Sequence, residues 1–245
     1  IGKPIAETSQ IKLLKVINET ETNLNTKQML INVSLQIRLM DKLAVDKLLD
    51  ERNKNKDALV GKVKQTNLTL QQSLPSYDEL IDYLEALYQT SNWTNYIINY
   101  LLINYNVRNQ DLNFKIVRFL RDTKDKTLNY IWLAPKKIVY IRNVYKTAST
   151  YGQKKITITD KKFTVAIKRV YACQKHGDDG CVFIPNIDQL GYHIMKSTYK
   201  QIGEGAVLKV IINHYIKDVA KLTEISKNRG TDISTLLANY NITDV

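Results

Sequence analysis

The chain has 245 residues, with 36 Lys and Arg against 24 Asp and Glu, a formal net charge of +12. This length provides core for one large domain or for two smaller ones, and we predict two. The positive charge favours a polyanionic partner, nucleic acid first, while no apolar run of about 18 residues indicates a membrane helix. No signal peptide is visible, and because the first residue is Ile rather than Met we expect a fragment or a processed product.

The N-terminal third is predicted to be helical. Residues 26–50 place apolar side chains at helical spacing, and a shorter helix is expected around 59–63 after a polar run. Residues 66–75, which contain Gln, Ser and Pro, indicate an interdomain linker. We therefore expect a helical domain over residues 1–72 and a second domain over residues 73–245.

The second domain is expected to open with two helices. Ser76 is followed three residues later by Glu79, the spacing of a capping box that starts a helix over Tyr77–Gln89. The strongly apolar stretch Trp93–Tyr105 then predicts a buried helix.

A short β-rich region follows these helices. Residues 130–133, 138–141 and 156–158 are rich in Ile, Val, Tyr and Trp, which favours strands, and residues 149–152 indicate the turn of a hairpin. From Phe163 onward the pattern is helical again. The fold class predicted is therefore mainly α with a small antiparallel β-sheet, an α+β fold.

Two cysteines flank one loop in the helical part. Cys173 and Cys181 enclose His176, Asp178 and Asp179. Structural zinc sites use four ligands at characteristic spacings, whereas this cluster offers at most three. We predict a Gly-Asp-Asp-Gly turn in a reduced intracellular chain, without metal or disulfide.

The last residues carry a pattern that points to a specific chemistry. Gly230 stands ten residues before Tyr240, with Ser and Thr between them. Upstream, Arg108 lies in Asn-Val-Arg-Asn-Gln-Asp-Leu, with Asp111 three residues later. Both segments resemble the tyrosine recombinase (phage integrase) family, whose members have a Gly-His or Gly-Trp pair before a nucleophilic tyrosine and an arginine in Gly-Leu-Arg-x-x-Glu-Leu.

The resemblance implies a fold and a reaction. The fold is a tyrosine recombinase catalytic domain, preceded by a helical core-binding domain. In the reaction the tyrosine, here Tyr240, attacks a DNA phosphodiester, arginines such as Arg108 bind the phosphate oxygens, and a lysine protonates the leaving oxygen. Lys146 is the residue expected in that last role, with Lys154 and Lys155 as alternatives. The family requires neither a metal nor another cofactor.

Three positions depart from the family's pattern. Ala206 and Lys209 take the positions of its His-x-x-Arg motif, and Thr231 stands where the family has His or Trp. Lysine keeps the positive charge but cannot form the bidentate hydrogen bonds of a guanidinium, while Thr231 retains a hydroxyl donor. Arg229 is expected to supply a second guanidinium if the turn brings it inward.

The resemblance also implies duplex DNA as the partner, bound by basic side chains of both domains. Family members work as tetramers on two duplexes, so a homo-oligomer is expected and a membrane is not. The expected DNA contacts are Lys27, Arg38, Lys42, Lys154, Lys155 and Arg229.

Three functions are compatible with these patterns. The first is site-specific recombination or integration of DNA for a virus or mobile element, in the nucleus, a viral replication compartment or the virion. The second is an architectural or packaging DNA-binding protein that no longer cleaves DNA. The altered positions Ala206, Lys209 and Thr231 favour this function. The third is a type IB topoisomerase, which shares the tyrosine chemistry but relaxes supercoils as a monomer.

Overall fold

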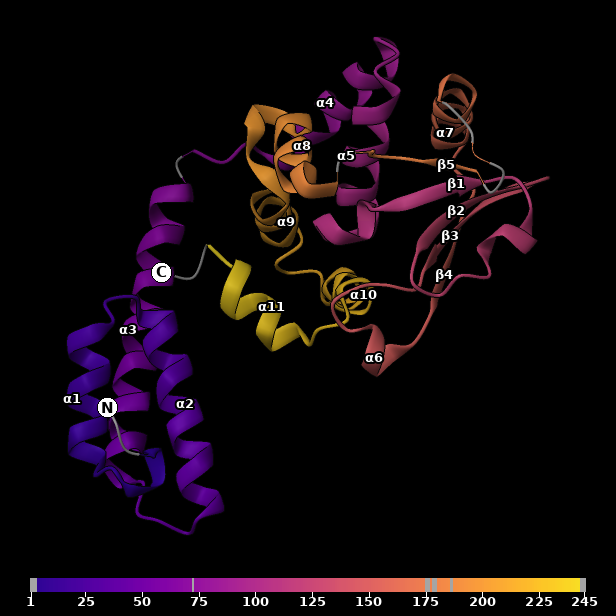
Figure 1. The fold of residues 1–245 in the computed structure, drawn as a ribbon. Helices are drawn as coiled ribbons and strands as arrows, with labels where there is room; N and C mark the ends of the chain where they lie inside the picture. Colours follow the sequence, from indigo (N-terminus) through magenta and orange to yellow (C-terminus); the bar gives the residue numbers. More distant parts are fainter. Residues whose placement is uncertain (1–3, 72, 175–176, 178–179, 186, 243–245) are drawn as a thin grey trace. The chain divides into compact units, whose positions relative to one another are not determined.

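The structure is a computed structural model that describes residues 4–71, 73–174, 177, 180–185 and 187–242. The chain divides into two compact units, Ile1–Leu70 and Gln71–Asp244. Most of it is helical, with a small sheet confined to the second unit (Figure 1). Over the described ranges, no helix combines the length and the apolar character that crossing a bilayer requires.

The described residues of the first unit form three helices around a small apolar core. The helices are α1 (Gln10–Thr20), α2 (Leu24–Met40) and α3 (Asp46–Gln71), after the 3-10 turn η1 (Ile5–Glu7). The side chains of Ser9 and Asn23 accept backbone N–H groups at the starts of α1 and α2, which satisfies donors that the first helical turn leaves free. Four buried residues form the centre of the core: Ile17, Ile31, Leu35 and Leu48.

Helix α3 corrects two predictions. It is continuous to Gln71, so residues 59–63 are no separate short helix, and residues 66–71 of the expected linker 66–75 are helical. The polar run inside it contains neither Gly nor Pro, so nothing in it stops the helix. Asn55 also anchors this run to α2, because its amide donates to the Leu24 carbonyl and to Gln28 at 2.9 and 2.8 Å.

Arg38 has a structural position inside the first unit. Only 7% of it is exposed, and its guanidinium donates to the carbonyls of Thr8 and Ala44 at 2.7 and 2.9 Å. The expectation that Arg38 is a surface contact for DNA is therefore corrected. Of the other two cations expected there, Lys42 is exposed and Lys27 is half-buried.

The second unit begins with the two predicted helices, α4 (Tyr77–Gln89) and α5 (Trp93–Tyr105), and both predictions are confirmed. The capping box is also present, with reciprocal bonds between Ser76 and Glu79 at 3.1 and 2.8 Å. The remaining helices of this unit are α6 (Ala148–Tyr151), α7 (Lys161–Cys173), α8 (Leu190–Ser197), α9 (Gly203–His214), α10 (Val219–Arg229) and α11 (Ile233–Tyr240).

The sheet has five strands in the order β4-β3-β2-β1-β5. Strands β1 and β2 are parallel, whereas the other neighbours are antiparallel, so the predicted antiparallel sheet is corrected to a mixed one. The parallel pair is possible because the chain between β1 and β2 makes a 3-10 turn, η3 (Leu120–Thr123), and returns to the same end of the sheet. The strands are β1 (Phe114–Val117), β2 (Asn129–Ala134), β3 (Lys137–Arg142), β4 (Lys154–Ile158) and β5 (Cys181–Val182).

The two faces of the sheet belong to apolar clusters of different size. Strand residues such as Ile116, Ile131 and Tyr140 belong to the main core, together with apolar residues of α5 and α7. The alternate residues Tyr130 and Val139 belong to a smaller cluster on the other face. The sheet is therefore held mainly from the α5 and α7 side.

The connection between β3 and β4 differs from the predicted turn. Residues 148–151 form the short helix α6, and Gly152 follows it with a φ of 67°. The two strands still pair antiparallel, from Ile138 opposite Ile158 to Arg142 opposite Lys154. This connection lies close to the end of α10, because Thr147 approaches Gly230 there (Figure 1).

Candidate active site

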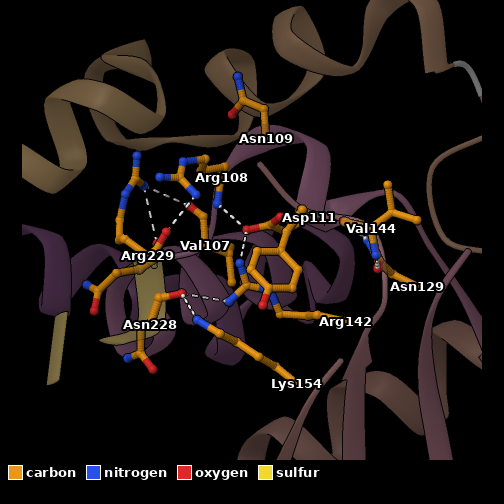
Figure 2. A network of polar contacts seen from close by, with 12 residues as sticks. Val107, Arg108, Asn109, Asp111, Asn129, Arg142, Val144, Lys154, Asn228 and Arg229 are labelled. Atoms are coloured by element: carbon orange, nitrogen blue, oxygen red, sulfur yellow. Dashed lines mark hydrogen bonds and ion pairs between the residues drawn. The ribbon is translucent and has the colours of Figure 1, made fainter. Parts of the chain in front are cut away.

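Three basic side chains converge on the C-terminal end of α10 (Figure 2). The last carbonyls of a helix lack partners within the helix and carry the negative end of its dipole, so cations are favoured there. In this chain every one of the last three carbonyls of α10 receives such a bond. The bonds run from Arg108 Nη1 to the Arg229 carbonyl (2.7 Å), from Arg142 Nη1 to the Asn228 carbonyl (2.9 Å) and from Lys154 Nζ to the Lys227 carbonyl (2.5 Å).

A buried ion pair fixes the backbone of Arg108. Asp111 and Arg142 are both fully buried, and Asp111 Oδ2 accepts from Arg142 Nη2 at 2.5 Å. The same oxygen accepts the backbone N–H of Arg108 at 2.8 Å, which closes the turn η2 (Asn109–Leu112). Burial raises the pKa of the Asp111 carboxyl, and the adjacent Arg142 opposes that rise. The motif in the sequence placed Asp111 three residues after Arg108, but nothing in it indicated that Arg142 pairs with Asp111.

Arg229 is held at the centre of the site. Its side chain is 4% exposed, and Nη1 donates to Glu204 Oε1 at 2.7 Å and to the Asn106 carbonyl at 3.2 Å. Its other amino group, Nη2, donates to the Tyr240 hydroxyl at 3.4 Å, and the guanidinium carbon lies 5.7 Å from the centre of the Tyr240 ring. The turn therefore does bring Arg229 inward, next to Tyr240.

Gly230 sets the turn that follows. Its φ of 61° is in the left-handed region that favours glycine, and a Cβ there would lie 2.2 Å from Thr147 Oγ1. Asp232 then caps the start of helix α11, because its side chain accepts the Thr235 backbone N–H at 2.7 Å. Tyr240 is the last residue of α11, so this turn and cap determine its position.

These elements enclose a pocket of about 340 Å³. Five residues singled out in the sequence contribute to its wall, although their places in the chain span more than half of the second unit. The lining residues are Arg108, Lys146, Arg229, Thr231, Thr235, Leu236, Asn239 and Tyr240. The wall thus combines a phenolic hydroxyl, two guanidinium groups and one ammonium group.

The three lysines considered for proton transfer have different surroundings. Lys146 is exposed and lines the pocket. Lys154 is half-buried above the Tyr145 ring, and its ammonium group donates to a carbonyl at the end of α10. Burial, followed by the charge of Arg142, lowers the pKa of Lys154. Lys155 is exposed at the next position of β4, whose side chains alternate between the faces of the sheet. Of the three lysines, Lys146 is therefore the one that lines the pocket together with Tyr240.

Lys209 does not line the pocket. Burial lowers its pKa, and it lies five residues after Glu204 on α9, which places the two side chains about 140° apart around the helix. The expectation that Lys209 takes the place of the family's second arginine is corrected, because the α9 residue that reaches the site is Glu204. Ala206, aligned with the family's histidine, does not line the pocket either.

Glu204 and Arg142 were missed from the sequence as site residues. Glu204 is an acidic residue in the first turn of a helix, a common position with no functional meaning alone. Arg142 follows the buried residues 138–141 at the end of β3. A charged side chain after such a run is the available signal, since an arginine is rarely buried without a charged partner.

No candidate metal centre is found in the described part of the chain, where no three His, Cys, Asp or Glu side chains gather. Cys173 is exposed and Cys181 is buried, and both are free thiols. His176, Asp178 and Asp179 of the predicted turn between them lie outside the described residues.

Comparisons of the chain with protein-family models, with curated proteins and with solved structures found no match.

Proposed function

We propose that the chain cleaves and rejoins DNA strands through a covalent 3'-phosphotyrosyl link at Tyr240, as tyrosine recombinases do. The observation that carries the proposal is the contact between the Tyr240 hydroxyl and Arg229 Nη2, in a pocket that Arg108 and Lys146 also line. A nucleophile beside several phosphate-binding cations is the arrangement that this reaction needs.

Each residue of the site has its own role in the proposed reaction. The Tyr240 hydroxyl loses its proton to solvent as its oxygen attacks phosphorus, and the bond from phosphorus to the 5' oxygen breaks. Negative charge then gathers on the nonbridging oxygens, where the guanidinium groups of Arg108 and Arg229 stabilise it. Lys146 gives its proton to the departing 5' oxygen. Because one phosphoester replaces another, the 5'-hydroxyl of the same or of a partner strand reverses the step.

Arg229 takes the part of the family's second arginine in this proposal. It comes from the end of α10 rather than from α9, where Lys209 was expected to supply the charge. Thr231 lines the same pocket, and its hydroxyl is the hydrogen-bond donor available in place of an imidazole or indole. The site thus keeps two guanidinium groups despite its departures from the family's motifs.

Duplex DNA is the partner in this proposal. The net charge of +12 favours the phosphate backbone through counterion release, and Lys42 is an exposed cation of the first unit. Assembly of several copies on two duplexes, and a role in moving viral or mobile DNA, belong to the same proposal.

One observation favours a second function, DNA binding without cleavage. Glu204 places a carboxylate against Arg229, within the group of cations that would bind the phosphate. A negative charge there opposes the phosphate, and Arg108 and Lys154 already donate to protein carbonyls. A protein that only organises DNA would tolerate this arrangement.

A suicide duplex distinguishes the two functions. The protein is incubated with nicked duplexes, from which the cleaved end diffuses away, and covalent adducts are counted on a denaturing gel. We expect an adduct with the unchanged protein, none with Tyr240→Phe, and equal duplex binding by both. Tyr192→Phe is the matched control, since Tyr192 is 57% exposed and also lies beside a lysine, Lys196.

Other results would contradict the proposal. Salt-sensitive duplex binding without any adduct would favour the DNA-organising function, and an equal adduct from Tyr240→Phe would exclude Tyr240 as the nucleophile. Relaxation of supercoiled plasmid by the monomer, without a specific site, would favour a topoisomerase.

A further inference from the structure

We infer that Glu204 is a positioning residue, which holds the Arg229 guanidinium so that one amino group faces Tyr240 and the phosphate. This inference rests on the proposed function and adds a residue to it. Three observations support it: the hydrogen bonds of Arg229, the hydrogen bonds of Glu204 and the proximity of Arg108 to Arg229.

The bonds of Arg229 divide its two amino groups. Nη1 faces three acceptors, Glu204 Oε1 at 2.7 Å and the carbonyls of Asn106 and Val107 at 3.2 and 3.5 Å. Nη2 donates to the Tyr240 hydroxyl at 3.4 Å, and each amino group has two hydrogens. Within the described ranges, Nη2 therefore keeps one hydrogen that a phosphate oxygen can accept.

Glu204 is itself fixed on both oxygens. Oε1 accepts from Arg229, and Oε2 accepts the backbone N–H of Asn109 at 3.3 Å. Its side chain is only 15% exposed and stands in the first turn of α9, where the helix dipole favours a carboxylate. One side chain thus connects α9, the turn after Arg108 and the end of α10.

Glu204 also offsets the repulsion between two cations. Burial, and next the charge of Arg229, lowers the pKa of Arg108, while Glu204 opposes that change. Two guanidinium groups beside one pocket repel each other until a phosphate arrives. A carboxylate on the far amino group of Arg229 keeps both cations in place and leaves one Nη2 hydrogen for the phosphate.

Substitution of Glu204 tests this role. Glu204→Ala lets the guanidinium turn away, and a misplacement of about 1 Å is expected to slow single-turnover cleavage at saturating DNA by about 100-fold. Duplex affinity stays close to that of the unchanged protein, because the cation remains. Glu204→Gln recovers part of the rate, since its amide oxygen still accepts from Arg229 while its NH₂ faces the Asn109 N–H.

Glu85→Ala is the matched control, because it removes a carboxylate from an exposed ion pair with Lys162 in the same unit. Its cleavage rate should equal that of the unchanged protein. Cleavage by Glu204→Ala at the unchanged or a faster rate would overturn the inference and identify the carboxylate as an obstacle to phosphate. If Glu204→Ala does not fold, the rate of Glu204→Gln decides, since a rate at or above that of the unchanged protein also overturns it.

A measurement without DNA separates this inference from the proposed function. In protein labelled with ¹⁵N-arginine, a held guanidinium gives separate Nη1 and Nη2 resonances, which Arg229→Lys assigns by their loss. We expect these resonances to merge in Glu204→Ala and to stay separate in Glu85→Ala. If no adduct forms but the resonances merge, the proposed function fails while Glu204 still positions Arg229. Separate resonances in Glu204→Ala would overturn the positioning role.

Discussion

Replacing Gly230 by alanine is expected to destabilise the second unit strongly. A non-glycine residue at a φ of 61° costs about 1–2 kcal/mol. The new Cβ would also meet Thr147 Oγ1 at 2.2 Å, and relieving such overpacking costs about 1–3 kcal/mol. The free energy of unfolding should therefore fall by about 2–5 kcal/mol in Gly230→Ala.

A second substitution separates the two costs. Thr147 Oγ1 is buried with no hydrogen-bond partner among the described residues, so Thr147→Ala alone should be close to neutral. It removes the oxygen that the new Cβ meets, while Tyr151 Cδ2 at 3.3 Å and the Thr147 Cβ at 3.4 Å remain as close contacts. The double variant should therefore lose less than Gly230→Ala does, mainly the backbone cost of about 1–2 kcal/mol relative to Thr147→Ala.

Urea unfolding followed by tryptophan fluorescence measures these changes. Both tryptophans, Trp93 and Trp132, belong to the second unit, so the signal reports that unit. Gly205→Ala is the control, because a Cβ there meets nothing within 4 Å and its backbone needs no positive φ. Equal stability of Gly230→Ala and Gly205→Ala, or no recovery in the double variant, would refute the reasoning.

The remaining predictions concern the buried ion pair, the cap of α11 and the pocket lysine. Asp111→Ala leaves the buried charge of Arg142 without a partner, so the free energy of unfolding in urea should fall by about 3–5 kcal/mol. Adding Arg142→Met should recover part of that loss, and additive losses from the two substitutions would contradict this prediction. Hydrogen bonds, first from Ser234, lower the pKa of Asp232 from 3.8 to about 2, so its stabilisation is full above 3.8 and disappears as the pH falls through about 2. The difference in melting temperature between the unchanged protein and Asp232→Asn should shrink to nothing as the pH falls through that range. A difference that stays constant would contradict this role of Asp232. Lys146→Ala should reduce the slope of log affinity for duplex DNA against log salt by about one, and an unchanged slope would place Lys146 away from the phosphates.

Local signals in the sequence predicted the helices that lead to the site. The capping box of Ser76 and Glu79 and the apolar run after it correctly bounded α4 and α5, because these features depend on neighbours in the chain. Strand β1 and strand β5 were not predicted, since four and two residues show too little alternation. Their pairing depends on contacts between segments far apart in the sequence.

The site was predictable where it depends on spacing and unpredictable where it depends on distant partners. Gly230 and Tyr240 share one turn and one helix, so their separation in the sequence indicated their proximity. Glu204 meets Arg229 across 25 positions, and only the packing of α9 against the end of α10 brings them together. Lys209 was misplaced because an alignment of motifs ignores which face of α9 points at the pocket.

The most direct test of the account is to identify the residue that carries the DNA. A suicide duplex is trapped on the protein, nuclease removes all but the last nucleotide, and peptide mass spectrometry locates the added 3'-phosphonucleotide. We expect the nucleotide on the peptide containing Tyr240, linked to that side chain. A nucleotide on another tyrosine, or on Lys146, would contradict it.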